Sequence, residues 1–225
     1  MSANSHIMKH SWNLDRPEAL MLQRQLARQV IRTPGIKIQD VTTVAGIDTH
    51  YHKGIATAAV VALRLAELTA VDQATAVRRI TFPYLPGLLS FREGPVVLDA
   101  LNKLRSPPDV LIFDGHGIAH PRRFGLACHL GLLMDIPSIG CAKTWLLGRY
   151  TEPEIEKGSY SYLRDGKEII GAVVRTRRNV KPLFVSIGHR INLQNSIRIV
   201  LKCCRRYRLP ESIRRAHQIA SDLGK

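Results

Sequence analysis

The chain has 225 residues, of which 45% are hydrophobic and 23% charged, so it resembles a folded protein and not a disordered one. No apolar run approaches the length of a membrane span, and residues 1–12 lack the apolar core of a secretory signal peptide. A total of 33 Lys and Arg against 18 Asp and Glu gives a net charge of +15, which indicates a polyanionic partner such as nucleic acid.

The chain is expected to form a single domain. We expect residues 13–225 to fold together, because no repeat, low-complexity tract or Gly/Ser linker divides them, and residues 1–12 to be a disordered leader. None of the four cysteines belongs to a CxxC pair. They are therefore interpreted as buried thiols of a protein that resides in the reducing cytoplasm, with no membrane attachment.

Helical and strand patterns alternate along the chain. Asp15 followed by Pro17 is typical of a helix N-terminus. Three β-rich runs with short breaks predict an antiparallel meander, and a later Asp-Gly pair predicts a hairpin. In chain order we expect a helix over 15–32, strands over 41–51, 55–65 and 70–82, a helix over 91–104, a strand over 109–113, a helix over 125–134, a strand over 137–142, a hairpin over 160–177, a strand over 183–187, and helices over 192–207 and 211–223. This order indicates the α/β class, with a mixed sheet covered by helices.

Two aspartates occur at or near the ends of predicted central strands. Asp48 comes late in the first strand, and Asp114 directly follows the apolar run 110–113 (VLIF). A carboxylate beside such a run is costly unless a cation or a hydrogen-bond donor compensates it. Either aspartate alone fits a turn or a helix cap equally well. Together, in a basic protein, they favour a divalent-metal site with oxygen ligands.

A third carboxylate follows an unusual loop. Glu93 lies three residues after Ser90, a spacing that also fits a helix capping box. Pro83 and Pro86 bracket Tyr84 and restrict the backbone of this loop. A stiff loop with an aromatic tip is suited to wedge between stacked bases, and the alternative is a surface turn whose tyrosine packs on the core.

Basic residues gather in the segment 114–125. His120 and Arg122 are expected to donate hydrogen bonds to phosphate oxygens, and the alternative for the arginine is a solvated turn. His116 and His120 have a spacing that suits zinc on a helix, but the glycine between them and the proline after them disfavour a helix.

Two further candidate site residues, a lysine and a histidine, lie after later predicted strands. Lys143 comes after the small-residue strand, where an ammonium group stabilises a phosphate or a developing negative charge. His189 lies between a strand and a helix, and is interpreted as a residue that completes a metal shell or moves a proton. A lone lysine is more often a solvated surface residue, and a lone histidine is usually structural.

Six segments together carry a family resemblance. They are 45–48 (AGID), 83–93 (PYLPGLLSFRE), 114–122 (DGHGIAHPR), 139–143 (IGCAK), 188–190 (GHR) and 207–211 (YRLPE). In these motifs the chain resembles endonuclease V, the deoxyinosine-directed repair nuclease, over nearly its whole length. The resemblance implies an RNase H-like fold, a mixed five-stranded sheet whose first three strands are antiparallel and which helices flank.

The resemblance also implies catalytic roles. By resemblance, Asp48 and Asp114 bind Mg²⁺, for which Mn²⁺ is a substitute, and Glu93 completes the acidic triad. Lys143 matches the lysine on the phosphate side, and His189 matches the position that assists near the metal.

The same resemblance implies how DNA is held. Tyr84, preceded by Pro83, matches the wedge residue that fills the gap left by the extruded base. The pocket for hypoxanthine is implied to be built largely from backbone, with four residues expected to line it: Gly87, Leu89, Gly125 and Gly140. Trp145 is bulkier than expected near this pocket.

The implied activity is Mg²⁺-dependent hydrolysis of the second phosphodiester bond 3′ to a deoxyinosine, which leaves 3′-hydroxyl and 5′-phosphate ends. The implied partner is inosine-containing DNA, bound by a monomer. An endoribonuclease of the same fold that acts on inosine in RNA is one alternative. A non-catalytic nucleic-acid-binding protein is the other, but three carboxylates within a basic surface would weaken phosphate binding unless a metal neutralised them.

Overall fold

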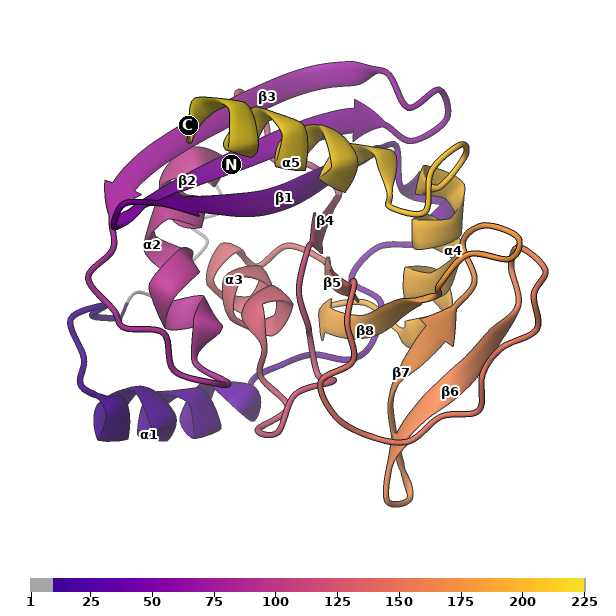
Figure 1. The fold of residues 1–225 in the computed structure, drawn as a ribbon, viewed down its shortest axis with the longest axis horizontal. Coiled ribbons are helices and arrows are strands. Elements are labelled where there is room, and N and C mark those ends of the chain that lie inside the picture. The colour runs from indigo at the N-terminus through magenta and orange to yellow at the C-terminus, as the bar shows by residue number, and fades with distance from the viewer. Residues whose placement is uncertain (1–9, 225) are drawn as a thin grey trace, which may run out of the picture.

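The computed structural model describes residues 10–224, in which eight strands form one mixed sheet in the order β3-β2-β1-β4-β5-β8-β7-β6 (Figure 1). The strands are β1 (Thr43–His52), β2 (Ile55–Arg64), β3 (Ala70–Arg79), β4 (Val110–Phe113), β5 (Ser138–Ala142), β6 (Tyr160–Asp165), β7 (Glu168–Val174) and β8 (Leu183–His189). The expectation of five strands is therefore wrong, because β8, β7 and β6 extend the sheet beyond β5.

The first part of the sheet has the expected directions. β1, β2 and β3 are successive antiparallel neighbours, which confirms the meander. β4 and β5 then run parallel to β1, and β8 runs antiparallel to β5. All four residues of β4 are apolar and buried, as expected of a strand that is covered on both faces.

Of the five α-helices, four cover the two faces of the sheet, and α1 packs against α3 (Figure 1). They are α1 (Arg16–Ala27), α2 (Leu89–Leu101), α3 (Leu126–Met134), α4 (Leu193–Cys203) and α5 (Glu211–Leu223), with a 3-10 turn, η1 (Ile38–Asp40), before β1. Alternate residues of β2 point to opposite faces, so Ala59 and Val61 share a core cluster with α5, while Ala58 and Val60 pack with α2 and α3. The sheet is thus enclosed between α5 with α4 on one side and α2 with α3 on the other.

α1 and α4 both end before the expected limit. α1 begins with the expected cap, since Asp15 and Glu18 exchange hydrogen bonds of 2.8 and 2.9 Å as a capping box, but it ends at Ala27 and not near residue 32. The chain leaves the helix because the backbone beyond it pairs elsewhere: Arg190 donates to Ile31 and accepts from Gly35, both at 2.7 Å. α4 likewise ends at Cys203, before the expected limit near 207.

The capping-box interpretation of Ser90 and Glu93 is wrong. α2 begins at Leu89 after Leu88, without a side-chain cap. Ser90 Oγ instead lies 2.9 Å from Nδ1 of His129 in α3, which leaves Glu93 available for another contact.

The expected start of the domain at residue 13 is too late. Nε2 of His10 lies 2.8 Å from Nε2 of the buried His129, and the Trp12 ring packs edge-on to Phe91. Residues 10–12 therefore belong to the folded unit, and the rest of the expected leader, residues 1–9, lies outside the described residues.

All four cysteines are buried and unpaired, as expected of core thiols. Among residues 10–224, no helix combines the length and the hydropathy that are needed to cross a bilayer.

Candidate active site

The register between β1 and β4 brings two aspartates together. Ile47 of β1 lies opposite Phe113 of β4, and the amide of Asp114 donates to the Ile47 carbonyl at 3.1 Å. Asp48 and Asp114 are therefore the next residues on two adjacent parallel strands. Their side chains are 11% and 12% exposed, so both carboxylates are largely withdrawn from water.

The ammonium group of Lys143 forms an ion pair with Asp114. Lys143 follows β5, the next strand after β4, so it reaches the same edge of the sheet. Burial raises the pKa of Asp114 to about 6 although Lys143 opposes the shift, and the neighbouring Asp48 raises it further. Three residues that lie far apart in the sequence thus meet where the sequence pattern predicted.

Glu93 approaches the same edge from α2. Its side chain is buried and accepts a hydrogen bond of 2.6 Å from the hydroxyl of Tyr51, near the end of β1. Burial raises the pKa of Glu93 to about 8, and the charges of Asp48 and Asp114 add to this rise. Glu93 is thus close enough to Asp48 and Asp114 for their charges to disfavour its ionisation.

The expected position of His189 beside the carboxylates is wrong. His189 ends β8 and pairs with Ser138 at the start of β5, the end of that strand opposite to Lys143. There it is buried, accepts a hydrogen bond of 3.3 Å from the amide of Ile31, and contacts Asp135 at 3.4 Å. It belongs to the opposite edge of the sheet because β8 runs antiparallel to β5.

A different histidine contacts the acidic site. His217 of α5 donates from Nδ1 to Oδ2 of Asp48 at 2.7 Å, and its ring is half exposed. His217 is not among the site residues that were predicted from the sequence. The available signal was its position in α5 next to the buried stripe Ile213, Ala216 and Ala220, which faces the sheet.

The carboxylates have the donor chemistry for a hard divalent cation, because Mg²⁺ prefers oxygen ligands. Within the chain, the ammonium group of Lys143 pairs with Asp114, and Nδ1 of His217 donates a hydrogen bond to Asp48. As they stand, no three or more His, Cys, Asp and Glu side chains among residues 10–224 are arranged to hold a metal ion. Lys143 and His217 each contact Oδ2 of their aspartate, so a metal bound here would use the carboxylate lone pairs that these contacts leave open.

A cavity of about 230 Å³ opens directly beside the acidic site. Gly115 and Thr144, the residues after Asp114 and Lys143, both line it. Three of the four residues expected in the base pocket line it as well, namely Gly87, Leu89 and Gly125, together with Tyr84. Tyr84 is 70% exposed, so it stands at the rim and does not pack on the core.

The fourth expected pocket residue, Gly140, does not line this cavity. Gly140 lies in β5 beneath the loop after β4, where a Cβ atom would overlap the backbone of His116 and Gly117. It allows the loop to lie close to the sheet. His116 lines the cavity instead, and its Nδ1 is buried with no hydrogen-bond partner among the described residues.

His120 and Arg122 point into the protein and not toward solvent, where a phosphate contact was expected. His120 is buried, donates from Nε2 to the Gly87 carbonyl at 3.0 Å and accepts from the Arg122 amide at 3.2 Å, so neither ring nitrogen is available for phosphate. Burial lowers the pKa of His120 to about 4, which keeps the ring neutral. The guanidinium of Arg122 also turns inward, to the same carbonyl at 2.7 Å.

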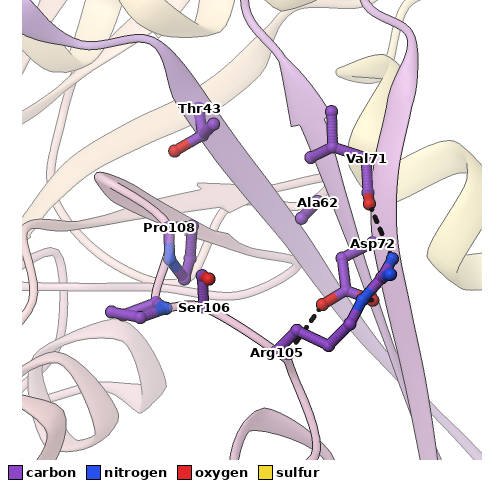
Figure 2. A pocket seen from close by; sticks show the side chains of 8 residues that line it. Thr43, Ala62, Val71, Asp72, Arg105, Ser106 and Pro108 are labelled. Atoms are coloured by element: carbon purple, nitrogen blue, oxygen red, sulfur yellow. Dashed lines mark hydrogen bonds and ion pairs between the residues drawn. The ribbon is translucent and has the colours of Figure 1, made fainter.

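A second cavity, of about 360 Å³, lies at the other end of β1, where Thr43 begins the strand (Figure 2). Its charged groups are already paired: Asp72 accepts from the backbone amide of Arg105 at 2.8 Å, and the Arg105 guanidinium donates to the Val71 carbonyl at 3.1 Å. None of the predicted site residues lines it. Size alone therefore does not identify the functional cavity.

Known proteins share both the sequence and this structure. The Endonuclease V family model matches residues 24–218. An Endonuclease V of Roseiflexus castenholzii is 50% identical over 212 residues, which cover 94% of this chain and 95% of the relative. The crystal structure of Endonuclease V from Streptomyces avermitilis has a TM-score of 0.90 and 41% identity, with 96% of each chain covered.

A more distant relative has been solved with nucleic acid. Ciona intestinalis Endonuclease V, with 28% identity, a TM-score of 0.81 and 92% and 96% of the two chains covered, was crystallised with a 24mer DNA containing an inosine followed by a ribo-adenosine. Because the family model covers most of the chain and half of the aligned residues are identical to a curated relative, the family is established. The chain belongs to the endonuclease V family of nucleases.

Proposed function

We propose that this protein cleaves DNA at deoxyinosine, the deamination product of deoxyadenosine, as a step in DNA repair. The reaction is hydrolysis of the second phosphodiester bond 3′ to the lesion, which leaves 3′-hydroxyl and 5′-phosphate ends. The observation that carries the proposal is the acidic pair Asp48 and Asp114 directly beside a base-sized cavity with Tyr84 at its rim. Support also comes from the inosine-containing DNA bound to the Ciona relative.

In this proposal Asp48, Asp114 and Glu93 hold Mg²⁺, or Mn²⁺ as a substitute. A divalent cation supplies polarisation of the phosphate and a more acidic water. Lys143, already beside Asp114, offsets the charge that develops on the phosphate oxygens. His217, half exposed and in contact with Asp48, orients that carboxylate and carries a proton at the edge of the site.

The cavity of about 230 Å³ receives the extruded base. Flipping a hypoxanthine out of the stack costs less than flipping a well-paired base, and this difference contributes selectivity. Tyr84, exposed on a loop that its two prolines stiffen, fills the gap left in the helix. The His116 side chain forms part of the wall of this cavity.

RNA is the second candidate substrate. The DNA in the Ciona complex carries a ribonucleotide directly after the inosine, so that relative accommodates a 2′-hydroxyl beside the lesion. Cleavage of inosine-containing RNA, and of DNA with a ribonucleotide after the inosine, is therefore measured alongside cleavage of inosine-containing DNA.

The remaining properties form part of the same proposal. The order β3-β2-β1-β4-β5 with its antiparallel first three strands supports an RNase H-like fold. One continuous sheet supports a single domain, which we propose acts as a monomer. Four buried, unpaired cysteines support a location in the reducing cytoplasm.

The test uses end-labelled strands that carry a single inosine in DNA, in RNA, or in DNA with a ribose after the inosine. Each is incubated with the protein and Mg²⁺, Mn²⁺ or a chelator, and the same strands with adenine are the control. We expect a cut at the second bond 3′ to inosine with either metal, and none with chelator or with Asp48→Asn. Binding without cleavage in Mg²⁺ would refute the proposed nuclease activity. A cut 5′ to the inosine would refute the proposed cleavage position.

A further inference from the structure

The carbonyl oxygen of Gly87 accepts three hydrogen bonds from side chains of two other segments. Gln23 of α1 donates from Nε2 at 3.0 Å, Arg122 from Nη2 at 2.7 Å, and His120 from Nε2 at 3.0 Å. A carbonyl has two lone pairs, and one of these donors is charged, so the oxygen is held more firmly than an ordinary loop carbonyl.

Gln23 is the centre of this arrangement. It is 1% exposed, although the side chain is polar and uncharged. Its Nε2 also donates to the Phe124 carbonyl at 2.7 Å, and its Oε1 accepts a hydrogen bond from Nε of Arg122. One amide therefore connects α1, the loop before α2 and the loop before α3.

The clamped carbonyl belongs to the loop that carries Tyr84. On either side of this loop, Phe82 and Leu88 are buried in one apolar cluster with Ala19 of α1. Residues 83–87 between them are exposed or half-buried, so apolar packing fixes the base of the loop but not its tip. Gly87 has φ +77°, a conformation that suits glycine and turns its carbonyl toward the clamp.

The clamp also forms one side of the base-sized cavity. Gln23, Gly87 and His120 line the cavity together with Tyr84. A change in the position of Gly87 would alter the cavity wall and the place of the rim tyrosine at the same time.

We infer that Gln23, together with Arg122, is a positioning pair that fixes the Tyr84 loop for lesion recognition. The inference rests on the proposed function, because it assigns these residues to selection of the flipped base. Neither residue touches the acidic site, so loss of the clamp affects recognition of the lesion and leaves the chemical step intact. It also gives Arg122 a role other than the phosphate contact that the sequence suggested.

The central variants are Gln23→Met, which keeps the length but removes every hydrogen bond, and Gln23→Glu, which keeps the acceptor for Arg122 but loses both donations. Gln25→Met is the matched control, because residue 25 lies exposed on the same helix. Arg122→Met removes the other half of the clamp, and it decides the question if Gln23→Met does not fold.

The first measurement uses no nucleic acid. Hydrogen exchange of peptides that cover residues 83–89 is compared between the parent and each variant. We expect exchange in this loop to rise about tenfold in Gln23→Met, Gln23→Glu and Arg122→Met, with no change in β1 and β4. Unchanged exchange in these variants would overturn the clamp, whatever the substrate of the protein is.

The second measurement is steady-state cleavage of the inosine duplex, with undamaged duplex as a competitor. We expect KM to rise about tenfold in the Gln23 variants, with kcat and the inhibition constant of the undamaged duplex changed less than about twofold. The control Gln25→Met should match the parent in all three. An unchanged KM would overturn the recognition role. If the parent protein does not cleave inosine-containing DNA, the proposed function is wrong. The hydrogen-exchange measurement still tests whether the clamp holds the loop.

Discussion

Nδ1 of His217 lies 2.7 Å from Oδ2 of Asp48, so the last helix contacts the first strand at the acidic site. The contact depends on the packing of α5 across β1, where small and branched side chains of the helix cover the sheet. His189, the histidine that the motif pattern favoured, lies instead at the opposite edge, beside Asp135.

The two histidines should therefore behave differently on substitution. We expect His217→Gln to lower the cleavage rate by about 100-fold with little change in the melting temperature, because the side chain is half exposed and touches a proposed metal ligand. His189→Gln should lower stability instead, because the ring is buried between Ile31 and Asp135. Single-turnover cleavage and thermal unfolding of both variants separate these effects. Equal rates in the parent and His217→Gln would remove His217 from the proposed mechanism.

Stability without metal should depend on pH through the buried carboxylates. The folded-state pKa is raised for Glu93, to about 8, and for Asp114, to about 6, mainly by burial. Because the folded state favours the protonated forms, their contribution is fully present below the ordinary pKa of a carboxyl group and is lost as pH rises through these values. We expect the melting temperature in chelator to fall between pH 5 and pH 9, by about 2–4 °C for each kcal/mol lost.

Mg²⁺ should reverse this loss, because it binds the ionised carboxylates. The gain in melting temperature on adding Mg²⁺ should be larger at pH 8.5 than at pH 5.5, and cleavage should rise over the same interval. Glu93→Gln has no proton to lose and should flatten the dependence on pH. A gain that is the same at both pH values would argue against these carboxylates as the metal site.

Tyr84→Ala tests the wedge. Stacking of an aromatic side chain on a base is worth about 1–3 kcal/mol, so KM for inosine DNA should rise about tenfold or more. The melting temperature should stay the same, because the Tyr84 side chain is 70% exposed. Tyr160→Ala, at another exposed tyrosine on the distant edge strand β6, is the control and should keep the parent KM. If Tyr84→Ala also keeps the parent KM, the wedge role is wrong.

Gly46→Ala tests how α5 is held on β1. A Cβ atom at Gly46 would overlap the backbone of Ser212 and Ile213, so the helix that carries His217 would have to move. We expect a loss of about 1–3 kcal/mol in urea unfolding together with reduced cleavage. At Gly158 a Cβ atom would have no neighbour within 4 Å, although φ is +96°, so Gly158→Ala should show only backbone strain and full activity. Wild-type activity in Gly46→Ala would show that the position of α5 does not matter.

Much of the fold and part of the site follow from local sequence patterns. The strands were predictable because a strand depends on an apolar run and on the turn residues that flank it, all of which are close together in the sequence. β4 is the clearest example. The meeting of Asp48 and Asp114 was predictable too, since both lie at the carboxyl ends of apolar segments that pair in parallel. Lys143 followed from the same rule at the next strand.

Contacts between distant segments were beyond the reach of these patterns. His189 and His217 each lie at a strand end or on a helix, and only the antiparallel direction of β8 and the packing of α5 decide which one meets Asp48. Arg122 looked like a phosphate contact because its charge is visible in the sequence, but Gln23, 99 residues earlier, draws its guanidinium inward.

The sequence by itself determined the basic character of the chain, the order of its elements and the carboxylates at the strand ends, because these depend on composition and on neighbouring residues. The tertiary structure decided which histidine joins the acidic site, that the sheet continues through β8, β7 and β6, and that Gln23 and Arg122 grip the Gly87 carbonyl. Those outcomes depend on strand direction and helix packing, which bring residues together across long separations that no local pattern specifies.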